Sequence, residues 1–254
     1  NGESPVAIVA PATPADCFDA AFEACRISLE HMVPVYFLSD GYLGNGSEPW
    51  KFPQQNDLKK IHVKFEPSRN GAETEKFMPY LRDERFVRSW AIPGTAGIEH
   101  RVGGLEKEEN TGNVSYDPDN HQKMTELRQA KIDAIAGFIP RQTVDSGNEQ
   151  GDVLVLGWGS TYGSIRTAVR ELMEEGMDIS HAHVRYLNPF PSNLGELLKG
   201  FKHILVPEIN QGQLVRLIRD QYFVPATGIN KIKGRPFFVD ELKQEIKDAL
   251  SLKR

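Results

Sequence analysis

The chain has 254 residues, of which 39% are hydrophobic and 26% are charged, a balance typical of a folded globular protein. Its formal net charge of −5 excludes the basic surplus that nucleic-acid binding requires. No run of roughly 18 apolar residues occurs that could span a bilayer, and no signal peptide is evident, so we expect a cytoplasmic protein with neither nucleic acid nor membrane as a partner. The two cysteines, Cys17 and Cys25, are too few for an iron–sulfur cluster or a structural zinc site, so no metal is predicted in this chain.

The beginning of the chain predicts a strand, a helix and a second strand. Apolar residues fill positions 6–10 and 33–38, and the stretch 14–32 between them is expected to be helical. Thr13 is a good N-cap, and Asp16 three residues later completes a capping box. Continuously apolar strands are typical of a parallel sheet covered by helices on both faces. Two strands alone would be a fragment of such a sheet.

Residues 39–114 are rich in glycine, proline and charged residues, which predicts a long irregular segment. Loops of this length commonly bind ligands or form interfaces, and Trp50 and Trp90 favour an interface. A helix is expected at 119–138, followed by a polar linker at 141–151. The predicted domains are therefore residues 1–140 and 152–254.

Beyond the linker, strands and helices alternate at regular spacing. Such alternation is typical of a three-layer α/β domain with a largely parallel sheet. A domain of about 100 residues is large enough to fold alone. The predicted strands are 152–156, 179–186, 203–206 and 227–232, and the predicted helices are 164–175, 193–198, 213–222 and 239–250.

A glycine-rich turn, Gly157–Gly163, follows a predicted strand and precedes a helix, where backbone N–H groups can bind a phosphate. The pattern is GxGxxxG rather than GxGxxG, and no acidic residue ends the next strand to bind a ribose, so a tight turn without a ligand is favoured. His181 and His183 have a spacing found in metal sites. Because no third ligand lies near them in the sequence, we expect surface or interface histidines.

Polar residues also follow two predicted strands at their carboxyl ends, where ligands of open α/β sheets bind. Ser39, Asp40 and Tyr42 follow the second strand, where an acid could bind a ligand or simply cap a turn. Glu208 and Asn210 occupy the corresponding position in the second domain. No serine lies in a GxSxG elbow, so a catalytic triad is not indicated. The residues alone name no reaction.

Five segments resemble the alpha subunit of 2-oxoacid:ferredoxin oxidoreductases, especially its 2-oxoglutarate branch. The resemblance extends from end to end of the chain. The segments are 3–18 (ESPVAIVAPATPADCF), 35–50 (VYFLSDGYLGNGSEPW), 100–106 (HRVGGLE), 115–121 (SYDPDNH) and 206–214 (VPEINQGQL).

The resemblance implies that residues 1–140 are the later half of a pyrimidine-binding domain of thiamine-diphosphate enzymes, with long loops. Residues 152–254 would form a domain similar to the carboxy-terminal domain of transketolase. The complete complex would oxidatively decarboxylate a 2-oxoacid, passing electrons to ferredoxin and the acyl group to coenzyme A. Thiamine diphosphate, Mg²⁺ and an iron–sulfur cluster would be held mainly by the beta subunit, and none of them by this chain alone.

Two substrate-binding runs of the family's alpha subunit, similar to RGGPSTG and YPITP, are absent, and the glutamate that activates the thiamine ring would lie upstream. We therefore predict no catalytic residue here, and a chain that is inactive alone but supplies scaffold and an interface to the beta subunit. Ser39, Asp40 and Tyr42 would line the cofactor cleft or the interface, and Glu208 and Asn210 would form a structural junction. The alternative is a non-catalytic docking module, which copurification with a thiamine-dependent beta subunit would separate from an enzyme component.

Overall fold

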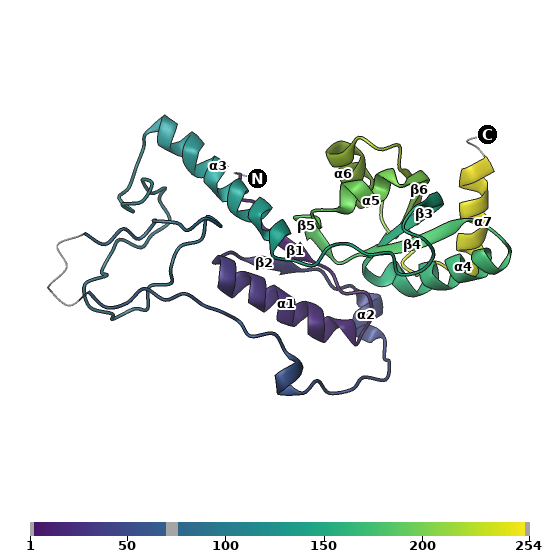
Figure 1. Ribbon diagram of the computed structural model, residues 1–254, viewed down its shortest axis with the longest axis horizontal. Helices are drawn as coiled ribbons and strands as arrows, with labels where there is room; N and C mark the ends of the chain where they lie inside the picture. Colours follow the sequence, from purple (N-terminus) through teal and green to yellow (C-terminus); the bar gives the residue numbers. More distant parts are fainter. Residues whose placement is uncertain (1–2, 70–75, 252–254) are drawn as a thin grey trace. The chain divides into compact units, whose positions relative to one another are not determined.

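The computed structural model describes residues 3–69 and 76–251. The chain forms two compact units whose segments interleave along the sequence (Figure 1). The domain boundaries expected around the linker at 141–151 stay a prediction. Unit 1 comprises residues 1–7, 23–36 and 52–138, and unit 2 comprises residues 8–22, 37–51 and 139–254.

A four-stranded parallel sheet with the order β4-β3-β6-β7 forms the centre of unit 2. Its central strand β3 pairs with β4 and β6 on either side, so that Val155 lies opposite both His181 and Leu205. The alternation of strands and helices predicted for this half of the chain is confirmed. The strands are β3 (Gly151–Trp158), β4 (Ile179–Val184), β6 (Phe201–Glu208) and β7 (Thr227–Asn230).

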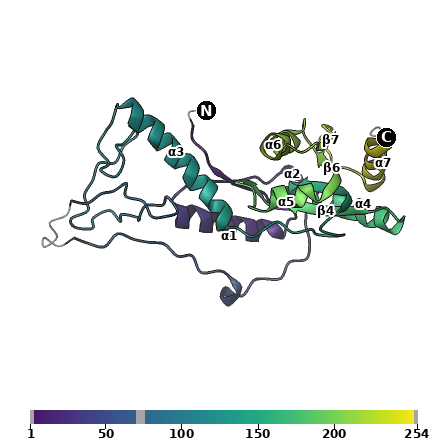
Figure 2. The same cartoon turned by 45° about the horizontal axis from the view of Figure 1, so that its top comes forward.

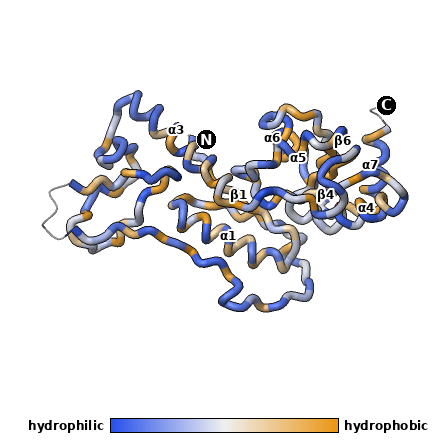
Figure 3. Tube along the Cα trace, in the orientation of Figure 1, coloured by the Kyte–Doolittle hydropathy of each residue, from blue (hydrophilic) through white to orange (hydrophobic). Residues whose placement is uncertain are grey.

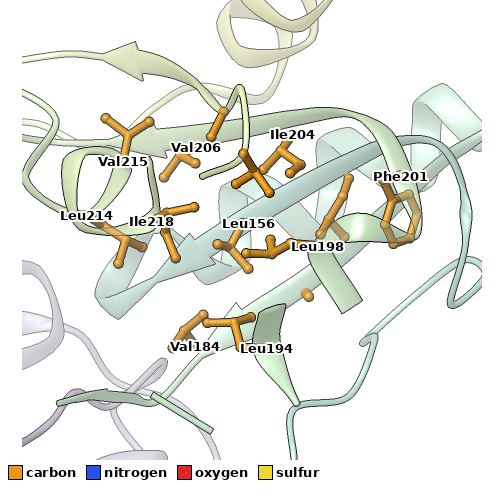
Figure 4. Packing of buried hydrophobic residues seen from close by; sticks show 14 of the residues in the cluster. Leu156, Val184, Leu194, Leu198, Phe201, Ile204, Val206, Leu214, Val215 and Ile218 are labelled. Atoms are coloured by element: carbon orange, nitrogen blue, oxygen red, sulfur yellow. The ribbon is translucent and has the colours of Figure 1, made fainter. Parts of the chain in front are cut away.

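Helices cover both faces of this sheet and bury two separate apolar clusters. Val153 and Val155 of β3 pack toward α4 and α7, whereas Leu154 and Leu156 pack toward α5 and α6, because successive side chains of a strand point to opposite faces. Figure 4 shows the second cluster, in which Leu156 lies among apolar side chains of β6, α5 and α6. The predicted three-layer α/β architecture is confirmed. The helices are α4 (Tyr162–Glu174), α5 (Leu194–Lys199), α6 (Gln213–Tyr222) and α7 (Val239–Ser251).

A second, three-stranded sheet has the order β2-β1-β5. The sequence predicts one strand over residues 179–186, but the chain leaves the parallel sheet after Val184 and Tyr186 begins β5, which pairs antiparallel with β1. Ile8 lies opposite Asn188 in this pairing. The expected two-strand fragment therefore gains a third strand from the later half of the chain. The strands are β1 (Ala7–Val9), β2 (Val35–Phe37) and β5 (Tyr186–Asn188).

Helix α1 (Asp16–His31) begins at the predicted capping residues. The backbone N–H of Asp16 donates to Thr13 Oγ1 at 3.2 Å, and Asp16 Oδ2 accepts from the N–H of Ala12 at 2.8 Å. The hydroxyl of Thr13 donates in turn to Glu48 Oε1 at 2.6 Å. The first N–H groups of a helix have no acceptor within the helix, and these side chains provide acceptors for such groups at the start of α1.

Most of the described residues in 52–69 and 76–117 have no regular secondary structure, as the sequence predicts (Figure 2). Apolar and polar residues alternate along this segment in short runs (Figure 3). Within it, Trp90 is held by a hydrogen bond from its indole N–H to the carbonyl of Leu29 at 2.8 Å. The remaining short elements of the described chain are α2 (Gly41–Asn45) and the 3₁₀ helices η1 (Gln55–Asp57), η2 (Ile135–Gly137, after α3) and η3 (Gly159–Thr161, between β3 and α4).

Helix α3 (Pro118–Ala134) follows, with Asp117 as its N-cap. Met124, Ile132 and Ile135 are buried, whereas Leu127 and Phe138 are only partly buried. Among residues 3–69 and 76–251, no helix combines the length and the hydropathy needed to cross a bilayer.

Candidate functional site

A cavity of about 590 Å³ lies in unit 2 where β3, β6 and β7 reach their carboxyl ends. This volume is in the range of small-molecule sites, and this edge of an open α/β sheet is where such proteins bind ligands. Its lining brings together segments that are far apart in sequence. Side chains that line it include Asp40, Tyr42, Asn45, Ser160, Ile209 and Arg235.

Asp40 joins two segments that the sequence singles out separately. Its Oδ1 atom accepts hydrogen bonds from the N–H groups of Tyr42 and Leu43, at 3.0 and 3.1 Å, and so caps α2. Its Oδ2 atom accepts a hydrogen bond from the hydroxyl of Ser160, in the turn between β3 and α4. Three protein donors therefore occupy this carboxylate, which fixes residues 40–43 against the glycine-rich turn.

The other two residues predicted with Asp40 lie differently. Tyr42 lines the cavity with 56% of its side chain exposed, so one side of its ring is accessible. Ser39 is exposed and outside the cavity lining, and its hydroxyl forms a hydrogen bond with the thiol of Cys17. Burial raises the pKa of that thiol, and the neighbouring Asp16 carboxylate acts in the same direction. The thiol is thus held in its protonated, unreactive form.

The residues of this cavity do not form a thiamine-diphosphate site by themselves. Among the described residues that line it, Asp40 is the only carboxylate, and its oxygens already accept from protein donors. Nowhere in residues 3–69 and 76–251 do three His, Cys, Asp or Glu side chains gather as a metal ion would require. We therefore assign no chemical step on that cofactor to this chain.

The glycine-rich turn after β3 is explained by packing. A Cβ atom at Gly157 would lie 2.5 Å from Cδ1 of Ile165 and 2.8 Å from Nδ1 of His183, which leaves room only for glycine. Gly159 has φ +59°, a left-handed conformation that other residues rarely adopt. The turn lets α4 pack closely on β3, in agreement with the structural role favoured from the sequence.

Glu208, at the end of β6, is fully buried and accepts four hydrogen bonds. Its Oε1 atom accepts from the indole N–H of Trp158 at 3.1 Å, from Nδ2 of Asn210 at 3.1 Å and from the N–H of Leu214 at 2.8 Å. Its Oε2 atom accepts from the N–H of Val215 at 3.0 Å. The carboxylate thus takes the position at the start of α6 where an external anion would otherwise bind.

Asn210 completes this junction. Its Oδ1 atom accepts from the N–H groups of Gly212 and Gln213, at 2.8 and 2.9 Å. Together with Glu208 it satisfies four of the N–H groups around the first turn of α6. This leaves the β6–α6 turn closed to a phosphate.

His181, expected at the surface or an interface, is buried within the chain, so that expectation is wrong for it, whereas His183 is partly exposed. The side chain of His181 is fully inaccessible, and its ring lies 5.5 Å from that of Tyr162, measured between centroids. The linker covers this edge of the sheet, because Ser146 pairs with His181 in a β-bridge. Burial lowers the pKa of His181 to about 4, with Arg166 acting in the same direction. The spacing of His181 and His183 predicts that they share one face of a strand, but it does not show that the polar linker covers that strand.

Arg235 is the site residue that the sequence pattern missed. Its guanidinium stacks over the ring of Phe238 at 4.3 Å, and its Nη1 atom lies 3.9 Å from Oε2 of Glu241. Lys231 binds that carboxylate much more closely, at 2.5 Å. Arg235 is therefore the cation at this cavity best able to bind an anion. The position after β7 could have identified it by the same strand-end rule that selected Ser39 and Glu208.

Two family models match the chain. Residues 2–117 match the model described as pyruvate flavodoxin/ferredoxin oxidoreductase, thiamine diphosphate-binding. Residues 151–242 match pyruvate:ferredoxin oxidoreductase core domain II. The first match ends just before α3, and the second starts at β3, so each falls on a separate part of the fold.

Curated relatives are similar along the whole chain. The sequence is 47% identical, over 99% of its length, to the 2-oxoglutarate oxidoreductase subunit KorA of Mycobacterium tuberculosis. It is 28% identical, over 98% of its length, to subunit alpha of the 2-oxoacid:ferredoxin oxidoreductase 1 of Aeropyrum pernix. These alignments cover 38% and 39% of the two relatives, so the chain spans about two fifths of their length.

A solved structure has the same fold over nearly the whole chain. It is the 2-oxoglutarate:ferredoxin oxidoreductase from Magnetococcus marinus with 2-oxoglutarate, coenzyme A and succinyl-CoA bound. The TM-score is 0.84 at 26% sequence identity, and the match covers 96% of this chain and 42% of that one.

Proposed function

Because this chain belongs to the 2-oxoacid:ferredoxin oxidoreductase family, in which it corresponds to part of an alpha subunit, we propose that the whole protein oxidises a 2-oxoacid. The substrate is 2-oxoglutarate, its carboxyl group leaves as carbon dioxide, the acyl group passes to coenzyme A and the two electrons pass to ferredoxin. The single observation that carries this proposal is the 47% identity to a 2-oxoglutarate oxidoreductase subunit over 99% of the chain.

The complete complex uses thiamine diphosphate, Mg²⁺ and an iron–sulfur cluster. These groups are bound mainly by a beta subunit. The description of the model that matches residues 2–117 supports the thiamine cofactor. The sequence supports placing the cluster elsewhere, because two cysteines cannot ligate it. The beta subunit and ferredoxin are accordingly the partners, and the complex works in the cytoplasm.

This chain contributes scaffold and interface rather than reacting groups. Asp40 and Tyr42 form part of one wall of the cavity, with Ser39 beside them, and we place this wall at the cofactor cleft or at the subunit interface. The contacts of Asp40 support a positioning role, because its carboxylate accepts hydrogen bonds from the N–H groups of Tyr42 and Leu43 and from the Ser160 hydroxyl. The hydrogen bonds of Glu208 and Asn210 support a structural junction, as their position in the sequence suggests.

The test is a substrate panel with the complete protein, copurified with its beta subunit. Reduction of ferredoxin is followed spectroscopically with 2-oxoglutarate, pyruvate or no 2-oxoacid, each with and without coenzyme A. We expect turnover that requires coenzyme A and is fastest with 2-oxoglutarate. A complex that contains the beta subunit but oxidises no 2-oxoacid would support the docking-module alternative instead.

A further inference from the structure

Four cations of unit 1 lie together at one face of helix α3. Met124, Arg128 and Lys131 occupy positions i, i+4 and i+7 of this helix and therefore follow one another along the same face. The Nη2 atom of Arg82 lies against that face, 3.7 Å from Sδ of Met124. Arg88 lies opposite Arg82 in an antiparallel β-bridge. Arg82, Arg88, Arg128 and Lys131 thus form one basic cluster.

The two guanidinium groups of the bridge share one aromatic ring. The Cζ atoms of Arg88 and Arg82 lie 4.3 and 5.8 Å from the centroid of the Tyr80 ring. Each group donates to a main-chain carbonyl, Arg82 to that of Tyr80 at 3.0 Å and Arg88 to that of Pro79 at 3.2 Å. Like charges that lie opposite each other in paired strands destabilise the pairing. These neutral acceptors hold the two groups in place without cancelling their charge.

The carboxylates that act on the basic cluster already have cationic partners. Asp83 binds Arg85 at 3.3 Å, and Glu109 forms an ion pair with Lys123. Within residues 3–69 and 76–251, no carboxylate forms an ion pair with the basic cluster. The Nζ atom of Lys131 donates instead to the carbonyl of Met32 at 3.2 Å. The described part of the chain therefore leaves the positive charge of the cluster unbalanced.

Partial burial makes this unbalanced charge unfavourable. Arg82 and Lys131 are both half-buried. Burial lowers the pKa of Arg82, and the charge of Arg88 acts in the same direction. Burial also lowers the pKa of Lys131 to about 8, with Arg88 and Arg82 acting in the same direction. Charges withdrawn from water are stabilised by an ion of opposite sign, so the cluster favours an anion that carries more than one charge.

We propose that the basic cluster binds a phosphate group, either as the free ion or on a small monoester. A phosphate monoester carries a charge of about −1.5 to −2 at neutral pH and has three acceptor oxygens. The planar guanidinium groups of Arg82 and Arg88 can each donate two parallel hydrogen bonds to such oxygens. A single carboxylate has one charge and would leave most of the charge of the cluster unbalanced. This site goes beyond the proposed catalytic function and does not depend on it.

Equilibrium dialysis with radiolabelled inorganic phosphate tests the proposal in the complete protein, copurified with its partner subunit. Ionic strength is held constant with chloride. We expect a phosphate site that is present in the wild type and lost in Arg88→Gln. Competition with glycerol 3-phosphate distinguishes the two sources, because displacement of the label assigns the site to a phosphate monoester and no displacement assigns it to the free ion. A complex in which no bound phosphate depends on Arg88 would overturn the proposal, as when another part of the complex covers the cluster.

An arginine elsewhere in unit 1 provides the matched control. Arg88→Gln should weaken phosphate binding by at least about tenfold, because it removes a charged donor that contacts the anion. Arg101→Gln removes the same charge from an exposed residue of unit 1 outside the cluster, and should leave phosphate binding unchanged. Equal losses in both variants would show a general attraction of anions to the protein and would contradict the proposed site.

Arg88→Met separates a ligand-binding role from a structural one. Methionine keeps an apolar stem beside the Tyr80 ring and removes the repulsion between Arg88 and Arg82. The urea midpoint in phosphate-free buffer should therefore stay the same or rise, while phosphate binding is lost. A lower urea midpoint with unchanged phosphate binding would assign Arg88 a structural role and overturn the proposal.

Discussion

Two carboxylates, Glu208 and Asp40, occupy positions where α/β proteins often bind anions. Glu208 accepts N–H groups at the first turn of α6, and Asp40 accepts the Ser160 hydroxyl just before α4. Glu208 belongs to the chain itself, so the β6–α6 turn keeps the geometry of an anion site but is filled internally. At residues 157–163 the glycine pattern instead reflects the close packing of Gly157 against Ile165 and His183.

Replacing Glu208 tests its role as an internal anion. Glu208→Ala should lower the free energy of unfolding by about 2–4 kcal/mol, because three or more buried donors lose their acceptor. Glu208→Gln should cost less, since it keeps one acceptor oxygen. Urea denaturation measures both variants. Glu245→Ala, on the exposed face of α7, is the control and should change stability by less than about 0.5 kcal/mol.

The Asp40–Ser160 contact can be measured by a double-mutant cycle. Asp40→Ala and Ser160→Ala should each destabilise the protein, and the double variant should lose less than the sum. We expect a coupling energy of about 1–2 kcal/mol, because the bond joins a charged acceptor to a buried hydroxyl. Chemical denaturation of all four proteins gives the cycle. Strict additivity would show that the two side chains act independently.

At the scale of elements, the linker covers strand β4 and so buries His181. Asp145 strengthens the cover, since its N–H donates to the carbonyl of His181 at 2.7 Å and its Oδ2 atom accepts from the N–H of His183 at 2.9 Å. His181 must stay neutral there, because its ring is buried and Arg166 is the charged group that acts on it. The edge of β4 should therefore respond to acid.

The sign of that response follows from the pKa of His181. Folding lowers this pKa from 6.5 to about 4, so the unfolded chain binds the proton first as the pH falls. The neutral His181 therefore contributes up to about 3 kcal/mol to the free energy of unfolding above pH 6.5. This contribution is lost as the pH falls from 6.5 to about 4. His181→Leu should make the free energy of unfolding less pH-dependent between pH 7 and pH 5. An unchanged slope in a folded variant would contradict the burial of a neutral histidine.

Hydrophobic periodicity predicts a helix or strand well where one apolar pattern corresponds to one element. Helix α6 has the bounds expected from the sequence, Gln213–Tyr222, because its apolar stripe is uninterrupted. The prediction of one strand at 179–186 is wrong, because the chain passes from one sheet to another at Arg185 and no local sequence feature marks the break. Strand pairing between distant segments decides that division. Arg235 follows a strand end, as the rule requires, but the sequence does not show that residues 40–46 pack beside its loop to form the cavity.

At the scale of the whole molecule, the family indicates the reaction, and the chemistry of the cavity indicates which part of it this chain supplies. The chain spans about two fifths of its curated relatives, and its own cavity contains a carboxylate that is engaged by protein donors. We therefore propose that the reacting groups lie elsewhere in the whole protein or its partners, and that this chain fixes the shape of one wall. The separation also explains why composition and spacing alone indicated an α/β protein without a reaction.

The most direct measurement is the 2-oxoglutarate-dependent reduction of ferredoxin, with coenzyme A, by the complete complex in its wild-type form and as Asp40→Asn. We predict turnover of the wild type that requires the beta subunit. We also predict a kcat of the variant within about threefold of the wild type, because asparagine keeps an acceptor for the α2 cap and we propose no reacting role for Asp40. Loss of a catalytic acid or base typically costs about 10²–10⁴ in rate. A wild-type complex that oxidises no 2-oxoacid, or a correctly assembled Asp40→Asn complex with a loss of that size, would contradict the account.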